Sequence, residues 1–310
     1  AITWVSGRKE LLAGIFFFAM IHGFRTFLTG RRWVWAAFIT VLCFLCGIMS
    51  KGHIIVGPAI LLLMVFHTRL VSPGTIRRSP SGIGVLLSLM SIVSLALAAR
   101  IAAGGVSLPA SLQADATTTI LFGDQLQLCL KYLLLIIAPI ELNHIYFTSA
   151  LGSGYWLLTL GSVIVLTCLL WLIFRWWRAS DSRSTIALMC IILLTPYLHL
   201  RPGVVYMANR YLFLVLPLAM LIATVTVSRS SIWNHLRPRL RYFAVGSIVI
   251  LYAGLCLPQH LAFRDSISLW TRMADVYPQS SWGYDRLGKA LIKLGEFQAA
   301  SGAWIKAANL

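Results

Sequence analysis

Long apolar segments separated by short, arginine-rich loops constrain this chain more than any other feature. Nine segments can be traced, at residues 11–29, 33–50, 52–67, 82–99, 126–146, 156–174, 185–200, 211–228 and 242–258. A helix needs roughly 20 apolar residues to cross the hydrocarbon core of a bilayer, and several segments reach or approach that length. Only 11% of the 310 residues are charged, against roughly 25% in soluble domains. The sequence predicts an all-α, polytopic transmembrane bundle of about eight to nine apolar segments.

The basic residues lie mostly in the loops between these segments. The formal net charge of +17 could indicate nucleic-acid binding, but this placement is the pattern of cytoplasmic loops in membrane proteins. We therefore expect no nucleic-acid partner. Four loops are expected on the cytoplasmic side, and they hold Arg25, Arg31 and Arg32; Arg69, Arg77 and Arg78; Arg175, Arg178 and Arg183; and Arg229, Arg237, Arg239 and Arg241.

The six cysteines all fall in apolar stretches. Cys43 and Cys46 form a C-x-x-C pair without the second pair that a structural zinc site requires. We interpret the cysteines as small apolar side chains in helices, and no metal site is predicted.

Segment 126–146 conflicts with a simple alternation of crossings. When the membrane crossings are counted forward from the N-terminus and backward from the C-terminus, both ends of this segment are expected outside the cytoplasm. Lys131, Pro139 and Glu141 also make it a poor lipid-facing helix. We predict a re-entrant or surface-lying segment; the alternative is that one short span, 52–67, does not cross.

The residues after 260 change character. Four of the nine acidic residues lie in the last 46 positions, which divides the chain into a membrane domain, 1–260, and a tail, 261–310. Ser266, Trp270 and Met273 are followed 34 residues later by Ala300, Trp304 and Ala307, and 34 is the tetratricopeptide period. We predict a tetratricopeptide-like helical hairpin, a repeat type that presents binding surfaces to partners.

Ionisable residues at membrane depth indicate function by default, although snorkelling to the lipid headgroups is the alternative for each one. A cluster of arginine, lysine and histidine at one interface suits a phosphate. The predicted outer set comprises Arg8, Lys9, Glu10, Lys51, His53, Arg100, Asp115, Asp124, Glu141, His144, His199, Arg201 and Arg210.

Four motifs in a fixed order resemble the tetratricopeptide-containing transmembrane O-mannosyltransferases and their bacterial relatives. The run from Thr3 to Leu12 (TWVSGRKELL) is similar to their W-x-x-G-R-x-[DE]-L-L segment, and 49–53 (MSKGH) to their S-K helix junction. Residues 135–142 (LIIAPIEL) resemble a P-x-x-L segment, and 208–217 (ANRYLFLVLP) an R-Y-L-Y-L element. Each motif is weak alone; their order, together with the tail, carries the resemblance over nearly the whole chain.

The resemblance implies a type-C glycosyltransferase fold. Such an enzyme moves a sugar from a polyprenyl-phosphate carrier to an acceptor, which we interpret as a protein. The transfer would take place on the outer face of a bacterial inner membrane. By position, Arg210 and Tyr211 would lie near the carrier phosphate, and Lys51 and Arg8 would border the same cavity. The family's essential acid lies upstream of the segment that matches Ala1, and we expect an N-terminal portion to precede this sequence. Asp115 and Asp124 are fallback candidates for a catalytic acid.

Two other functions stay open from the residues alone. The chain could be a non-catalytic membrane scaffold whose tail binds a partner, although nine segments exceed what an anchor needs. A transporter is the third interpretation, but no repeat relates the two halves of the membrane domain.

Overall fold

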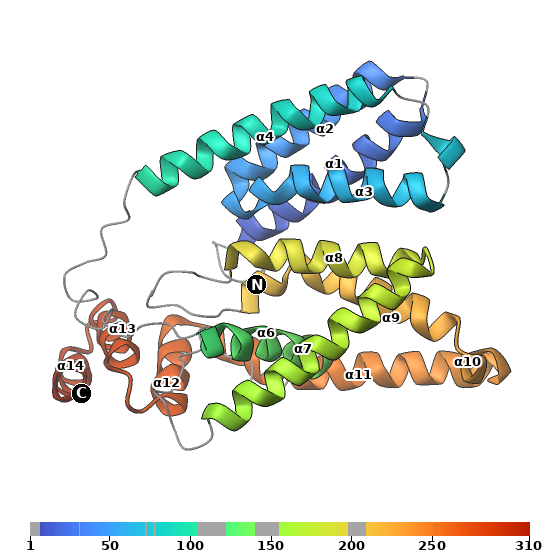
Figure 1. Cartoon of the computed structure of the whole chain (residues 1–310). Helices are drawn as coiled ribbons and strands as arrows, with labels where there is room; N and C mark the ends of the chain where they lie inside the picture. Colours follow the sequence, from blue (N-terminus) through green and yellow to red (C-terminus); the bar gives the residue numbers. More distant parts are fainter. Residues whose placement is uncertain are drawn as a thin grey trace. The chain divides into compact units, whose positions relative to one another are not determined.

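Every regular element in the described part of the chain is a helix (Figure 1). The computed structural model describes residues 7–30, 32–71, 73–76, 79–103, 122–139, 155–197 and 209–310. The predicted all-α class is confirmed, and it follows from the apolar runs, because a helix satisfies its backbone groups within its own segment. These helices form two compact units, one built from α1 to α9 and the other from α11 to α14.

Helices α1 (Gly7–Thr29) and α2 (Trp33–Ser50) pack closely as an antiparallel hairpin. A glycine lets the two backbones approach, since a Cβ atom on Gly23 would lie 2.9 Å from Thr40 Oγ1. Phe17 and Phe24 of α1 and Phe44 of α2 are fully buried. The hairpin is the best-packed part of the first unit and fixes Arg8 and Lys51 at one end and Arg25 at the other.

The chain continues through a short 3-10 helix, η1 (Gly52–Val56), into α3 (Gly57–Val71). A Cβ on Gly57 would lie 3.1 Å from the ring of Phe44, so the start of α3 sits directly on α2. After η2 (Pro73–Thr75), α4 (Pro80–Ala103) returns and its Ser94 Oγ donates to the carbonyl of Ile55 at 2.9 Å.

The second half of this unit is built around α8 (Ser182–Leu194), which contacts α3, α7 (Tyr155–Arg178) and α9 (Val215–Ser228). Helix α6 (Phe122–Ile137) is tied to α7 by a hydrogen bond from Gln127 Nε2 to Thr159 Oγ1 at 2.8 Å. Short elements η4 (Thr195–Tyr197) and η5 (Asn209–Leu212) lie after α8 and before α9, and α10 (Ser231–His235) follows α9.

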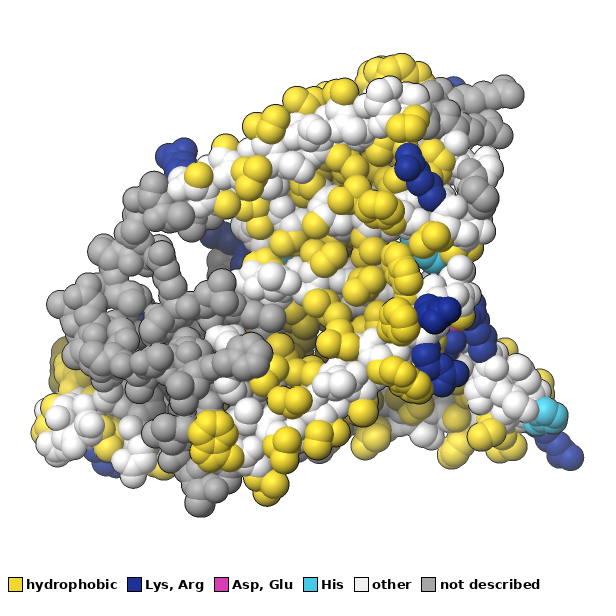
Figure 2. Space-filling model, viewed as in Figure 1, with side chains coloured by type: hydrophobic (Ala, Val, Ile, Leu, Met, Phe, Trp, Pro, Cys, Tyr) yellow, Lys and Arg dark blue, Asp and Glu magenta, His cyan; other side chains and the backbone are white. Residues whose placement is uncertain are grey.

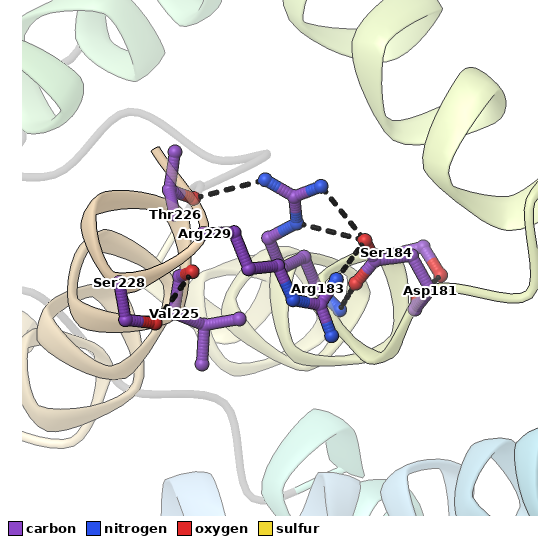
Figure 3. Close-up of polar contacts among 7 residues, drawn as sticks. All are labelled: Asp181, Arg183, Ser184, Val225, Thr226, Ser228 and Arg229. Atoms are coloured by element: carbon purple, nitrogen blue, oxygen red, sulfur yellow. Dashed lines mark hydrogen bonds and ion pairs between the residues drawn. The ribbon is translucent and has the colours of Figure 1, made fainter. Parts of the chain in front are cut away.

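Asp181 joins the turn between α7 and α8 to the end of α9, as Figure 3 shows. Its Oδ1 accepts from the backbone N–H of Arg183 at 2.9 Å, which caps α8, and its Oδ2 accepts from Arg183 Nη2 at 2.7 Å and Arg229 Nη1 at 2.5 Å. Arg183 also reaches Thr226 and stacks over Trp176. Burial opposes ionisation of Asp181, but the hydrogen bonds from Arg183 and the charges of both arginines outweigh it and lower its pKa.

Six described helices are long and apolar enough to cross a membrane: Arg8–Thr29, Trp33–Ser50, Gly52–Val71, Pro80–Arg100, Trp156–Arg178 and Pro238–Pro258. Three shorter apolar helices cover Gln125–Ile137, Ser182–Tyr197 and Val215–Ser228. Large hydrophobic side chains stay exposed along these helices, and Figure 2 shows many of them over one face. Such a surface is compatible with a membrane protein, while the predicted count of eight to nine segments stays a prediction.

The second unit consists of α11 (Pro238–Ala262), α12 (Ser266–Val276), α13 (Ser281–Ile292) and α14 (Phe297–Asn309). Helix α13 packs between α12 and α14 through two glycines. Gly283 lies against the backbone of Ala274, and a Cβ on Gly288 would lie 2.5 Å from Trp304 Nε1. Gly295, with φ +80°, makes the turn into α14. The structure shows helices where the hairpin was expected; their tetratricopeptide assignment and the boundary at residue 260 stay predictions.

Candidate functional site

Lys51 occupies the break between α2 and η1. Its backbone is extended, with φ −157° and ψ 123°, so the helix of α2 ends at Ser50. The Lys51 N–H still donates to the carbonyl of Gly47 at 2.8 Å, and its own carbonyl accepts from Ile54 at 3.2 Å. These two bonds satisfy the backbone at the break and hold the side chain at the end of the α1–α2 hairpin.

The Lys51 ammonium forms an ion pair with Glu10 in the first turn of α1. Glu10 is only 2% exposed, whereas the Lys51 side chain is 28% exposed. A buried carboxylate needs a charged partner, and the N-terminus of α1 also favours its negative charge. The pair therefore fixes Lys51 in place while part of its side chain stays accessible.

His53 lies next to this pair and opens a row of aromatic rings. Its side chain is buried, and its ring centroid is 5.3 Å from that of Tyr197 at the end of η4. Tyr197 in turn stacks on Tyr211 of η5, with centroids 4.1 Å apart and planes 16° from parallel. His53 Nδ1 is buried and has no hydrogen-bond partner among the described residues.

The segment after Tyr211 also reaches α1. A Cβ on Gly14 would lie 3.1 Å from the ring of Phe213 and 3.4 Å from the side chain of Leu214, so only a small residue lets this approach occur. Three of the four motif regions of the sequence, around residues 8–12, 49–53 and 209–217, thus meet at one end of the first unit. We refer to Glu10, Lys51, His53, Tyr197 and Tyr211 as the Lys51 cluster.

Cations outnumber carboxylates in and around the cluster. Arg8 and Lys9 are exposed in the same turn of α1 as Glu10, and Lys51 is the third cation. Glu10 is the one acidic side chain described at these positions, so a positive charge remains for an anionic ligand. In the described part of the chain, no group of three or more histidine, cysteine or acidic side chains could hold a metal ion.

The predicted site residues have different outcomes. Lys51 and Tyr211 belong to the Lys51 cluster, and Arg8 lies exposed two residues before Glu10. Arg210 lies in η5 and Asp124 in α6, but their side chains are outside the described part, as is the whole of Asp115. The role of each in binding a lipid phosphate stays a prediction.

Three members of the Lys51 cluster are not among the residues predicted to bind the phosphate. Glu10 and His53 stood only among the ionisable residues of the outer set, and Tyr197 was missed. An acidic residue one turn into an otherwise apolar helix is a usable sign of a buried pair, because it must find a cation. Nothing in the local sequence distinguishes Tyr197 from other interfacial tyrosines.

No family model, no curated protein and no solved structure matches this chain.

Proposed function

We propose that this chain belongs to a membrane glycosyltransferase that moves a sugar from a polyprenyl-phosphate carrier to an acceptor on the non-cytoplasmic face. The observation that supports it best is the Lys51 cluster. A partly accessible ammonium is held by a buried carboxylate beside a histidine nitrogen without a described partner. The resemblance of the motif order to the O-mannosyltransferases gives independent support.

The cluster suits the leaving group of such a transfer. When the bond between sugar and carrier breaks, negative charge develops on the carrier phosphate, and a cation fixed before the reaction stabilises it without reorganising. In this proposal Lys51 takes that role, and Arg210, the neighbour of Tyr211 in η5, adds a planar fork for the phosphate. Glu10 orients Lys51.

Carrier binding by the purified protein in zwitterionic nanodiscs tests this proposal. A short-chain polyprenyl phosphate should bind saturably, and Lys51→Ala should weaken binding about tenfold, the effect of losing one charge-assisted hydrogen bond. The matched control is Lys306→Ala, which removes the same charge from the exposed side of α14 in the second unit and should change affinity less than about twofold.

A second variant keeps the test valid if Lys51→Ala does not fold, because that change leaves Glu10 buried without its partner. The double variant Glu10→Gln/Lys51→Met removes both charges together. It should have the melting temperature of the wild type but bind the carrier more weakly than the wild type does. If this folded protein binds the carrier as well as the wild type, the proposed role of Lys51 is wrong. If the wild type shows no saturable binding, the scaffold interpretation replaces the enzyme.

The C-terminal helices complete the proposal. Helices α12 to α14 form a packed array after the last long apolar helix, and we assign to them the recruitment of a protein acceptor. Arg210→Ala should abolish sugar transfer in the complete protein and leave membrane insertion intact. Retained transfer would remove Arg210 from the site.

A further inference from the structure

A hollow of about 360 Å³ lies between α12 and α13 in the second unit. Apolar side chains form much of its lining. Ile267 and Trp270 contribute from α12, and Leu294, which is 69% exposed, contributes from the turn after α13. Trp270 is held in place by an edge-to-face contact with Trp282, with ring centroids 5.0 Å apart. The hollow therefore offers an apolar surface with a fixed aromatic ring.

Cations line the same hollow from one face of α13 and from its C-cap, Lys293. Arg286, Lys289 and Lys293 are spaced by three and four residues, which places them in a row along the helix. Lys289 is paired with Asp285 at 2.7 Å, and the Arg286 guanidinium lies over the ring of Trp282 at 5.2 Å. Lys293 has no ion-pair partner among the residues that the structure describes.

The acidic residue at the edge of the hollow is already engaged. Both carboxylate oxygens of Asp265 accept hydrogen bonds from Ser268, at 2.7 Å from its N–H and 2.8 Å from its hydroxyl. Asp265 thus serves as the cap of α12, and its single negative charge is outnumbered by the three cations of the lining, Arg286, Lys289 and Lys293. A net positive, partly apolar hollow remains.

We propose that this hollow binds an acidic peptide segment in which carboxylate side chains alternate with apolar ones. In an extended peptide, successive side chains point to opposite faces of the chain. The carboxylates on one face can therefore contact the row of cations, while an apolar residue on the other face packs on Trp270. The inference rests on the proposed function, in that the bound peptide would be the acceptor that the tail recruits. A concave hollow with an aromatic wall suits a peptide side chain better than a flat lipid surface.

The experiment measures binding of a fluorescein-labelled decapeptide of alternating Glu and Leu to the full chain in phosphatidylcholine nanodiscs. The reference peptide carries Gln in place of each Glu. We expect saturable binding of the Glu peptide only, weakened as salt rises from 50 to 500 mM. Lys293→Glu should weaken binding about fivefold to tenfold, since it replaces an attraction by a repulsion.

Lys306→Glu is the matched control, because it makes the same charge change on α14, outside the hollow. It should leave peptide affinity within about twofold of the wild type. Equal losses from both variants, or equal binding of the Gln peptide, would overturn the proposal. Displacement of the peptide by a short-chain phosphatidylglycerol below its micelle concentration would show a lipid-headgroup site and overturn it as well.

The result separates this inference from the proposed function. Peptide binding should be unchanged in the Lys51→Ala variant, because Lys51 lies outside the second unit. Carrier binding that depends on Lys51, without peptide binding, would overturn only the peptide site. Peptide binding without any carrier binding would overturn only the proposed transfer reaction.

Discussion

Asp181 combines two roles in one side chain, and a single substitution can separate them. Asn is as good a helix cap as Asp, so Asp181→Asn keeps the cap of α8 and removes only the charge that holds Arg183 and Arg229. We expect a loss of about 1–2 kcal/mol in stability, at the lower end of values for charged hydrogen bonds, because Arg229 is 54% exposed. Thermal unfolding of the wild type and of Asp181→Asn in detergent at pH 7 measures this loss of stability.

The same pair of proteins should show a defined pH dependence. The pKa of Asp181 is lowered from its ordinary value of 3.8, so its charge stabilises the fold fully above that pH and the benefit is lost as pH falls through the lowered pKa. The gap in melting temperature between wild type and Asp181→Asn should therefore be constant from pH 7 to 5 and shrink below about 3.8. A gap that persists unchanged at pH 2 would contradict an electrostatic origin.

Gly288 is the residue whose smallness matters most in the C-terminal helices. A Cβ there would lie 2.5 Å from Trp304 Nε1, and that nitrogen donates to the carbonyl of Asp285 at 3.3 Å. Gly288→Ala should force the ring away and destabilise α13 and α14 by about 1–3 kcal/mol, the usual cost of overpacking. Amide hydrogen exchange across 281–309 measures the loss of protection.

Gly302→Ala is the control for this change. It lies in α14 with open space around its Cβ position, so the substitution should keep or slightly raise protection, since Ala favours helix over Gly by about 1 kcal/mol. Equal loss of protection in both variants would show that Trp304 does not pack on Gly288 as the structure has it.

Prediction from sequence succeeds at the residue scale where the cause is local and fails where it is tertiary. Ala300, which the 34-residue period pairs with Ser266, is buried. Lys51 follows from its position at a helix junction. The pairing of Lys51 with Glu10 joins residues 41 positions apart, and the contact of Tyr197 with His53 joins two halves of the unit, so neither is visible in a local pattern.

Among the elements, α6 is the one whose path decides the topology. Its 16 residues would span about 24 Å, short of the roughly 30 Å of a hydrocarbon core. It ends at Ile137, before Pro139, as expected of a proline that cannot continue a helix. The re-entrant path predicted for 126–146 is compatible with this length, and residues 140–146 lie outside the described part.

Cysteine labelling tests the path of this segment. In a variant without the six native cysteines, single cysteines at positions 120 and 150 should both react with a membrane-impermeant maleimide added outside, because a re-entrant segment returns to the side it left. Cysteine at position 230, expected in a cytoplasmic loop, should react only after permeabilisation. Labelling at just one of 120 and 150 would mean that the segment crosses.

The other element-scale difference concerns α8 and α9. Apolar periodicity predicts segments 185–200 and 211–228, but α8 has 13 residues and α9 has 14, each shorter than a full span. The described 3-10 elements η4 and η5 flank them and carry Tyr197 and Tyr211. The tight, poorly hydrogen-bonded geometry of a 3-10 turn depends on tertiary contacts such as this tyrosine stack, which hydropathy does not report.

For the whole molecule, the proposed function requires that the C-terminal tail and the Lys51 cluster lie on the same side of the membrane. Arg183 and Arg229 pair with Asp181, and Arg175 and Arg178 lie in the last turn of α7. Arginine-rich loops favour the cytoplasm. Helices α1, α2, α4, α7 and α11 are each long enough to cross, and so is η1 continued by α3. If α8 and α9 also cross and α6 does not, eight crossings bring the tail to the outer face, where Arg8 and Lys51 are expected.

Reporter fusions test this orientation directly. Alkaline phosphatase fused after Leu310 should be active and green fluorescent protein at the same position dark, because the first folds only outside the cytoplasm and the second fluoresces inside. After Ser230 the two readouts should be reversed. Reversing the charge of the second arginine-rich loop by Arg69→Glu, Arg77→Glu and Arg78→Glu should reduce correct insertion, whereas the same three changes at Arg264, Arg272 and Arg286, beyond the last long apolar helix, should not. A fluorescent C-terminal fusion would place the tail in the cytoplasm, away from a carrier-linked sugar on the outer face, and would exclude acceptor recruitment by the tail.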